Sequence, residues 1–322
     1  MSAHADLRTY WIQTISPLHV GAGRGVGAID LPLIRERATG WPYVPGSAVK
    51  GVLRDHFERV HGEHSPLIRA AFGRQDESGS GDSSAGSLVF ADARIVALPV
   101  RSFSGTFAWC TSPLALRRVV DDAKSAALTD VPKPLPSLPA AAILVSGEPK
   151  SALPTATGQG GGKVYLDDLD LSPDAARAKD ADAWAKWLAD RVIGSDAAER
   201  KLFHERFAIV SDDVFAFLCS TATEIVARVA IDDSVKIVKD GALWYEESLP
   251  PEAILSGIVW RDRVFGKGES GLSGAELSKT FLDAELPALQ IGGKASVGKG
   301  RVHLSIDRAA PHSASEGGKS HG

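Results

Sequence analysis

Four glycines at alternate positions lie close to one isolated aspartate near the start of the chain. The glycines stand at positions 21, 23, 25 and 27, and the aspartate is Asp30. Glycine takes backbone conformations that other residues cannot, and it lets a ligand approach the backbone closely. A carboxylate beside such a loop could orient a 2′-hydroxyl, accept its proton, or hold a hydrated divalent ion against a phosphate. An aspartate that caps a turn would explain the same pattern structurally.

Histidines lie near two of the candidate segments. His19 precedes the first of these glycines and could transfer a proton or bind phosphate, while a structural histidine is an equal alternative. His56, His61 and His64 surround Glu63 but lack the H-E-x-x-H order of a zinc site. We therefore predict no metal site around Glu63.

A predicted helix that follows the glycine loop carries small and basic residues on one face. Apolar residues at spacings of three and four predict the helix, with Ser47 as its N-cap. The N-terminus of a helix favours anions because its backbone N–H groups are unpaired there. We therefore expect this face to bind phosphate through the residues at i, i+3, i+4 and i+7, which are Ser47, Lys50, Gly51 and Arg54.

A second glycine-rich segment, near the end of the chain, also carries cations. Residues 293–299 match the G-x-x-x-x-G-K start of a nucleotide-binding loop, but Gly300 stands where the magnesium-binding hydroxyl belongs. A strand-like RVHLSI then follows where that motif needs a helix, so ATP hydrolysis is disfavoured. A sugar–phosphate backbone fits better, and the residues expected to contact it are Gly292, Gly293, Lys294, Lys299 and Arg301.

Composition is that of a globular protein with a local basic region. The chain has 322 residues, a net charge of −4 and 44% hydrophobic residues, and no apolar run could span a bilayer. The first residues lack the basic and apolar segments of a secretion signal, which favours the cytoplasm. Cys110 and Cys219 stand in apolar surroundings and are expected to be buried, reduced thiols.

Alternating and helical patterns predict a mixed α and β chain. We expect strands over 7–16, 88–96, 101–110 and 254–260, a long β-hairpin over 222–248, and strand, loop and strand over 289–306. Helices are expected from Ser112-Pro113, over 212–219 and over 274–285, and around Trp184 and Trp187, which we assign to the core. The polar segment 73–87 predicts a loop. The proline- and glycine-rich segment 130–163 predicts an insertion that excludes a core strand.

Four stretches in this order resemble the RAMP superfamily and, within it, the backbone subunits of type III-B (Cmr) CRISPR effector complexes. They are LHVGAGRGVGAIDLP with PGSAVKG, LVFADARIVALPVRSFSGTFAWCTSP, GALWYEESLP, and LQIGGKASVGKGRV. The resemblance covers nearly the whole chain. It implies an α+β fold: a modified RRM-like, ferredoxin-type core in one domain over 1–308, with a helical and loop insertion at about 112–210. A projecting hairpin thumb over about 222–248 and a disordered tail over 309–322 complete this expectation.

The same resemblance implies an RNA-guided endoribonuclease. Such subunits stack as a filament of copies along a guide (CRISPR) RNA, together with other Cmr subunits, and each thumb interrupts the pairing of guide and single-stranded target RNA. The family cleaves the target at regular intervals with a divalent cation, magnesium or manganese, and the adjacent 2′-hydroxyl as nucleophile. The match of GAIDLP makes Asp30 the catalytic residue and a candidate metal ligand. His19, Tyr245 and Glu246 are weaker candidates, and Lys50, Arg54 and the 292–301 loop would hold the guide backbone.

Three alternatives stay open. The chain could be a structural guide-binding backbone without catalysis, the type III-A (Csm) counterpart, or a guide-processing RAMP endonuclease with His19 as general base. GALWYEESLP favours Cmr over Csm, and PGSAVKG with the predicted hairpin favours the backbone role over guide processing. No membrane partner is expected.

Overall fold

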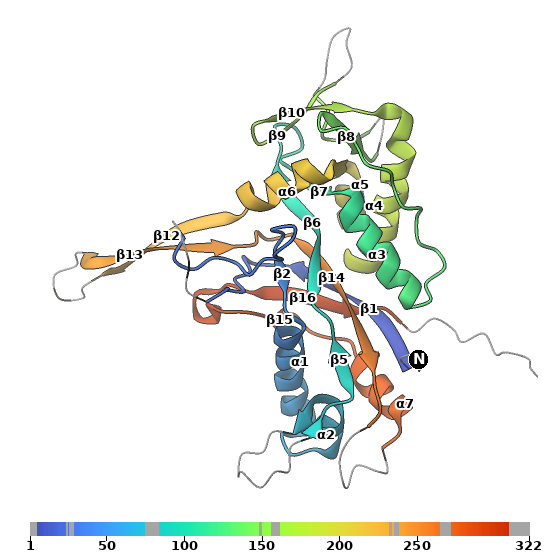
Figure 1. Cartoon of the computed structure of the whole chain (residues 1–322), viewed down its shortest axis with the longest axis vertical. Helices are drawn as coiled ribbons and strands as arrows, with labels where there is room; N and C mark the ends of the chain where they lie inside the picture. The colour runs from blue at the N-terminus through green and yellow to red at the C-terminus, as the bar shows by residue number, and fades with distance from the viewer. Residues whose placement is uncertain are drawn as a thin grey trace, which may run out of the picture.

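The computed structural model describes residues 5–23, 25, 29–74, 84–147, 150–155, 162–231, 234, 238–264 and 272–308, which form one large mixed sheet with helices on both faces (Figure 1). The strands follow the order β15, β16, β1, β14, β6, β7, β11, β8, β10 and β9, and β2 and β5 pair with β6 and β14. Neighbours in this sheet pair antiparallel, apart from the parallel pairs β7 with β11 and β8 with β10. The sheet is therefore mixed, and the chain combines helices and strands as the sequence predicts.

The bounds of the elements follow the chain from end to end. The strands of the large sheet are β1 (Ala5–Thr14), β2 (Tyr43–Val44), β5 (Leu88–Phe90), β6 (Ala93–Arg101), β7 (Phe107–Thr111), β8 (Ala142–Val145), β9 (Val164–Leu166), β10 (Leu169–Pro173), β11 (Phe207–Val210), β14 (Ile254–Arg261), β15 (Leu289–Gln290) and β16 (Arg301–Ile306). The α-helices are α1 (Gly46–His61), α2 (Pro66–Phe72), α3 (Pro113–Ser125), α4 (Ala178–Val192), α5 (Ala197–Arg206), α6 (Asp212–Thr221) and α7 (Gly274–Leu277). The short turns are η1 (Ala175–Arg177), the π-helical η2 (Ser278–Leu282) and η3 (Ala295–Val297).

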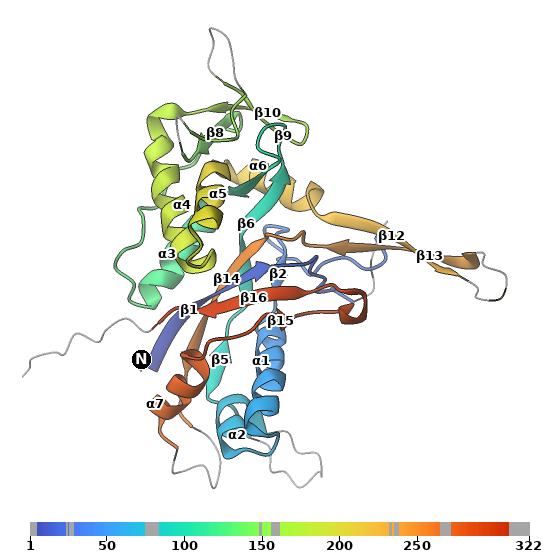
Figure 2. The ribbon, with the colours of Figure 1, turned by 180° about the vertical axis from the view of Figure 1, so that it is seen from behind.

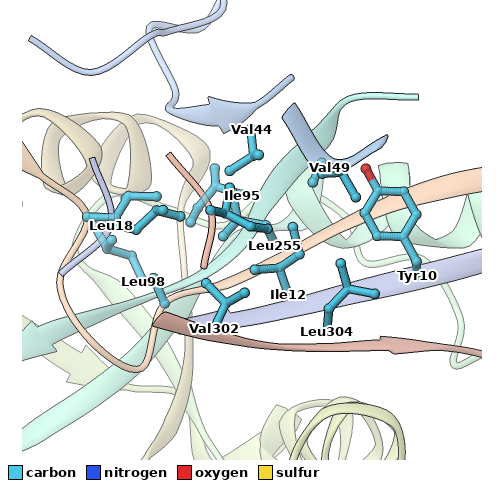
Figure 3. Packing of buried hydrophobic residues seen from close by; sticks show 14 of the residues in the cluster. Tyr10, Ile12, Leu18, Val44, Val49, Ile95, Leu98, Leu255, Val302 and Leu304 are labelled. Carbon is cyan, nitrogen blue, oxygen red and sulfur yellow. The ribbon is translucent and has the colours of Figure 1, made fainter. Parts of the chain in front are cut away.

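The core consists of two hydrophobic clusters, one on each face of the sheet. Successive side chains of a strand point to opposite faces, so Tyr10 and Ile12 of β1 enter one cluster while Trp11 enters the other. The first cluster packs β1, β14 and β16 against α1 (Figure 3). The second cluster packs the opposite face against α3, α4 and α5.

A two-stranded hairpin projects away from the body of the molecule in both views (Figures 1 and 2). It is formed by β12 (Glu224–Ile231) and β13 (Val238–Ser248), with Glu224 opposite Ser248 and Val229 opposite Leu243. These strands lie where the sequence predicts a hairpin over 222–248. The end of β13 and the start of β12 form its base, which lies against the loop that carries Asp30.

Most elements predicted outside 112–210 are present. The strands expected at 7–16 and 254–260 are β1 and β14, and the helix expected from Ser112-Pro113 is α3, whose N-cap is Ser112. Trp184 and Trp187 are buried in the second cluster, which confirms their assignment to the core. Both cysteines are free and buried. None of the helices in the described residues is long and apolar enough to cross a membrane.

The start of α1 differs from the prediction. Ser47 is not the N-cap, because α1 begins at Gly46 with Pro45 in the cap position and without a capping side chain of its own. Instead the carboxylate of Asp92 accepts a hydrogen bond of 2.8 Å from the Gly46 N–H. The acceptor comes from a residue 46 positions away, so the local spacing could not reveal it.

The interpretation of 130–163 as a segment without a core strand is wrong. Ala142–Val145 form β8, which pairs with β10 and β11, and Ile143, Leu144 and Val145 are buried. The wider range 112–210, predicted as helices and loops, also contributes β9, β10 and β11 to the large sheet. This stretch therefore extends the sheet rather than only covering it.

Three smaller predictions also need correction or limits. The segment 73–87 is ordered at both ends, where β3 (Gly73–Arg74) pairs with β4 (Ser84–Ala85), and residues 75–83 lie outside the described residues. The helix predicted over 274–285 ends at Leu282, as α7 followed by η2. The tail predicted over 309–322 lies outside the described residues.

Candidate active site

Asp30 lies exposed where the glycine-rich loop returns to the base of the hairpin. Its Oδ2 accepts a hydrogen bond of 2.8 Å from the backbone N–H of Tyr245 on β13. On the other side, the Gly25 N–H donates to the Asp30 carbonyl oxygen at 2.9 Å. A Cβ at Gly25 would lie 1.9 Å from the carbonyl oxygen of Ile29, so only glycine allows this closure. The loop and β13 therefore hold Asp30 from both sides and leave its carboxylate accessible.

The segment after Asp30 pairs with β13 through a single β-bridge. The Leu31 N–H donates to the Tyr245 carbonyl oxygen at 3.1 Å, and the Glu247 N–H donates to the Leu31 carbonyl oxygen at 3.0 Å. Leu31 thus bridges Glu246 in parallel, and Pro32, which has no N–H, follows directly. The bridge brings Asp30 next to Tyr245 and Glu246.

Glu246 is a buried carboxylate surrounded by cations. Its oxygens lie 2.8 Å from Lys294 Nζ, 3.4 Å from Lys299 Nζ and 3.6 Å from Arg228 Nε, and Trp244 Nε1 donates to it at 2.8 Å. Burial by itself would raise the pKa of Glu246, but the hydrogen bonds from Lys294 and Trp244 and the two lysine charges lower this pKa to about 2. The group is therefore ionised, and it attaches the 292–301 loop to the hairpin.

The 292–301 loop folds back onto the segment around His19. The Gly293 N–H donates to the His19 carbonyl oxygen at 2.9 Å, and the Gly300 N–H donates to the Pro17 carbonyl oxygen at 2.8 Å. Lys299 is buried and its Nζ donates to Ser248 Oγ at 2.8 Å, whereas the Lys294 side chain is about one-third exposed, at 35%. The two predicted lysines thus have different environments, and Lys294 is the more accessible.

His19 is buried beneath the site. Its Nδ1 lies 2.7 Å from the carbonyl oxygen of Glu247, which can only accept, so Nδ1 carries the proton and donates. The ring packs close to Gly21, where a Cβ would lie 2.9 Å from Nε2. These contacts agree with a structural role for His19. They give no support to a guide-processing enzyme that uses His19 as general base.

The predicted phosphate-binding face of α1 lies apart from Arg301. Lys50 Nζ donates to the Leu88 carbonyl oxygen at 2.9 Å, and Arg54 pairs with Glu58 at 2.6 Å, while Ser47 and Gly51 are exposed. Arg301 instead faces another side of α1. There it lines a hollow of about 320 Å³ together with Val52, Asp55, His56 and Arg59. The structure therefore joins Asp30, His19, Tyr245, Glu246 and the 292–300 loop at one place, and leaves the α1 residues outside it.

Two charged residues at this site are missing from the sequence-based candidates. Glu247 is buried and pairs with Arg35, and its Oε2 accepts a hydrogen bond of 2.9 Å from the Leu33 N–H. The available signal was the pair Glu246-Glu247 in a predicted strand, because alternation places two adjacent carboxylates on opposite faces. Glu246 and Glu247, on opposite faces of the strand, therefore each needed a positively charged partner at the hairpin base.

The donors for a divalent cation are few. Across the described residues no group of three or more histidine, cysteine, aspartate or glutamate side chains could hold a metal ion. Glu246 and Glu247 are taken up by ion pairs with Lys294 and Arg35. Asp30, by contrast, is exposed and can approach an ion.

Comparison with known proteins identifies the family. A family model described as RAMPs, the RAMP superfamily, matches residues 11–303. The chain belongs to the RAMP superfamily. It is 31% identical over 295 residues to the CRISPR system Cmr endoribonuclease Cmr4 of Pyrococcus furiosus, covering 92% of this chain and 94% of that relative. The match to the Csm endoribonuclease Csm3 of Enterococcus italicus is 32% identical over 74 residues, which is 19% of this chain and 35% of that protein.

Solved structures of Cmr proteins have the same fold. Oligomeric Cmr4 from Pyrococcus furiosus superposes with a TM-score of 0.68 at 26% identity, over 94% of this chain and 98% of the other. A chain of the type III-B Cmr-beta complex bound to cognate target RNA gives a TM-score of 0.69 at 20% identity, over 94% and 98%. The large mixed sheet with helices on both faces is therefore that of the Cmr4 structures.

Proposed function

We propose that this chain is the RNA-cleaving backbone subunit of a type III-B (Cmr) CRISPR effector complex. The observation that carries the proposal is the exposed Asp30 carboxylate, fixed on Tyr245 at the base of a projecting hairpin. It occurs in a chain that matches a Cmr endoribonuclease along 92% of its length, whereas the Csm3 match covers 19%. This difference favours the Cmr role over the Csm counterpart.

The proposed assembly follows from the resemblance. Copies of the chain stack along guide RNA with other Cmr subunits in the cytoplasm, and the structural neighbour described as oligomeric Cmr4 supports self-association. The sheet would serve as the modified RRM-like core over 1–308, and β12 and β13 as the thumb. The hairpin carries exposed apolar side chains, among them Val229 and Leu243, which suit contact with the faces of RNA bases.

Cleavage by an internal 2′-hydroxyl requires a distorted target strand. The 2′-oxygen, the phosphorus and the leaving 5′-oxygen must lie in line, which regular A-form RNA prevents. The thumb would supply this geometry by displacing one target nucleotide. The 2′-oxygen then loses its proton and bonds to phosphorus, the bond to the 5′-oxygen breaks, and that oxygen takes up a proton from water, giving a 2′,3′-cyclic phosphate and a 5′-hydroxyl. Tyr245 holds Asp30 Oδ2, so the second oxygen of Asp30 is left to orient the 2′-hydroxyl or accept its proton.

A divalent cation, magnesium or manganese, fits this site only as an ion shared with RNA. Asp30 offers one carboxylate, and Mg²⁺ commonly binds through one or two carboxylates together with substrate phosphates and water. Bound in this way, the ion would neutralise charge on the scissile phosphate. This chain would contribute two things to the site: the contact between Asp30 and the ion, and the positive charges of the side chains around Glu246.

Guide RNA would be held through its phosphates without regard to sequence. Lys294 and Arg301, the backbone of Gly292 and Gly293, and the α1 residues Ser47, Lys50, Gly51 and Arg54 remain our proposed contacts. Lys299 is buried and hydrogen-bonded to Ser248, so we assign it to holding the loop rather than to direct contact with phosphate.

The test is cleavage by the reconstituted complex with guide and target RNA. Asp30→Ala is expected to abolish regular cleavage while target affinity stays the same, and Asp121→Asn, at an exposed aspartate on α3, should cleave as wild type. Mass spectrometry of the products should find 2′,3′-cyclic phosphate ends. Unchanged cleavage by Asp30→Ala would leave only a structural guide-binding role for the chain.

A further inference from the structure

Glu247 connects the hairpin base to the segment that carries Asp30. Its carboxylate is buried and accepts hydrogen bonds from three places: the Arg35 guanidinium, the Thr223 hydroxyl at 2.9 Å and the Leu33 N–H at 2.9 Å. Leu33 and Arg35 belong to the segment after Asp30, while Thr223 lies at the start of the hairpin. The side chain thus joins the two segments whose contact places Asp30.

The backbone of Glu247 reinforces the same connection. Its N–H donates to the Leu31 carbonyl oxygen at 3.0 Å, and its carbonyl oxygen accepts from His19 Nδ1 at 2.7 Å. Two residues earlier on the same strand, the Tyr245 N–H holds the Asp30 carboxylate. Any shift of β13 relative to residues 31–35 would therefore move the donor on which Asp30 depends.

Arg35 extends the connection into the body of the protein. Besides its pairing with Glu247, its Nη1 donates to the carbonyl oxygens of Gly40 at 2.8 Å and Cys219 at 2.9 Å. Cys219 lies in α6, the helix that leads into β12. A charge-assisted pair in a buried setting is strong, and loss of one partner leaves the other uncompensated.

We infer that Glu247, together with Arg35, is a positioning residue for Asp30 in the cleavage reaction. This inference rests on the proposed function, in which Asp30 acts on the target RNA. Glu247 is buried, so it acts on the reaction through the two segments that it joins, the hairpin base and the segment that carries Asp30. Catalytic groups need placement to within about half an ångström, so a small shift of this segment should cost rate rather than affinity.

The first test separates rate from binding in the reconstituted complex. Glu247→Gln keeps the size of the side chain but removes its charge. It should slow single-turnover cleavage by about tenfold or more while target RNA affinity stays within about twofold. Thr223→Val removes one of the three donors and should slow cleavage to a lesser degree. The matched control is Asp122→Asn, which breaks the Arg94–Asp122 pair between α3 and β6, and it should cleave at the wild-type rate.

Two further measurements distinguish a positioning role of Glu247 from a general loss of structure. Asp30→Glu, which keeps a carboxylate but displaces it, should combine with Glu247→Gln to slow cleavage by less than the product of the two single effects, because both changes displace the same group. Hydrogen exchange at the Leu31 and Leu33 amides should quicken in Glu247→Gln but not in Asp122→Asn. Cleavage by Glu247→Gln at the wild-type rate, or a loss that only follows lost RNA affinity, would overturn the inference. Normal cleavage by Asp30→Ala would instead overturn the proposed function itself.

Discussion

Glu246 is the residue at which charge most clearly stabilises the hairpin base. Its pKa of about 2 lies below the ordinary glutamate value of 4.5, so folding favours the ionised form. The stability that it contributes is therefore fully present above about pH 4.5 and is lost as the pH falls towards 2. We expect the urea midpoint of the wild type to fall between pH 5 and pH 2.5. The Glu246→Gln variant should be less stable at pH 6 and should show a shallower fall over that window.

Lys294 and Lys299 allow the binding and holding roles of the 292–301 loop to be separated. Lys299→Met removes a buried cation that pairs with Glu246 and Ser248, and should lower the free energy of unfolding by about 3 kcal/mol. Lys294→Met alters a partly exposed pair and should cost about 1 kcal/mol or less. If Lys294 contacts phosphate, its loss should also lower the slope of guide affinity against salt by about one. Equal stability losses in the two variants would contradict the different environments of these lysines.

The sequence was sufficient to single out Asp30 and Tyr245 as candidates but not the buried residues Glu247 and Arg35 behind them. A carboxylate after a run of glycines is a local pattern, and the resemblance assigned it a role. Glu247 and Arg35 are 212 positions apart, and their pairing depends on how β13 lies against the segment after Asp30. The same limit applies to Lys299, whose burial comes from contact with Ser248, 51 positions away. Local spacing carries no information about such contacts.

At the scale of elements, the 292–301 loop depends on glycine at a crowded position. Gly300 has a φ of +84°, and a Cβ there would lie 2.1 Å from the Ile291 carbonyl oxygen. Gly298 has a similar φ of +82° but open space around it. Gly300→Ala should therefore destabilise the protein by about 3 kcal/mol or more, and Gly298→Ala by about 1 kcal/mol, measured by urea unfolding. Equal losses would show that backbone conformation, and not crowding, governs the loop.

Strand β8 shows why composition misled the prediction for 130–163. The strand is short, with the four apolar residues AILV. It stands between proline- and glycine-rich stretches, whose composition dominates any wider sequence window. Long alternating runs such as β1 and β14 were predictable because they carry their own signal. β8 is a strand because β10 and β11 pair with it on either side.

For the whole molecule, the position of β1 makes the two hydrophobic clusters depend on each other. Tyr10 and Ile12 pack with α1 on one face, and Trp11 packs with α4 on the other. The 112–210 stretch joins the same sheet through the β7–β11 pairing. Loss of β1 from the sheet would therefore expose both hydrophobic clusters.

This arrangement predicts cooperative unfolding of one domain over 1–308. Leu144→Ala in β8 should lower the free energy of unfolding by about 2–5 kcal/mol, because it leaves a cavity in the second cluster. Far-UV circular dichroism and tryptophan fluorescence should shift together, and hydrogen exchange should quicken in α1 as well as in α4. Leu202→Ala, at an exposed site on α5, is the matched control and should change little. Two separate transitions, with α1 protected while α4 opens, would instead make 112–210 an independently folding insertion.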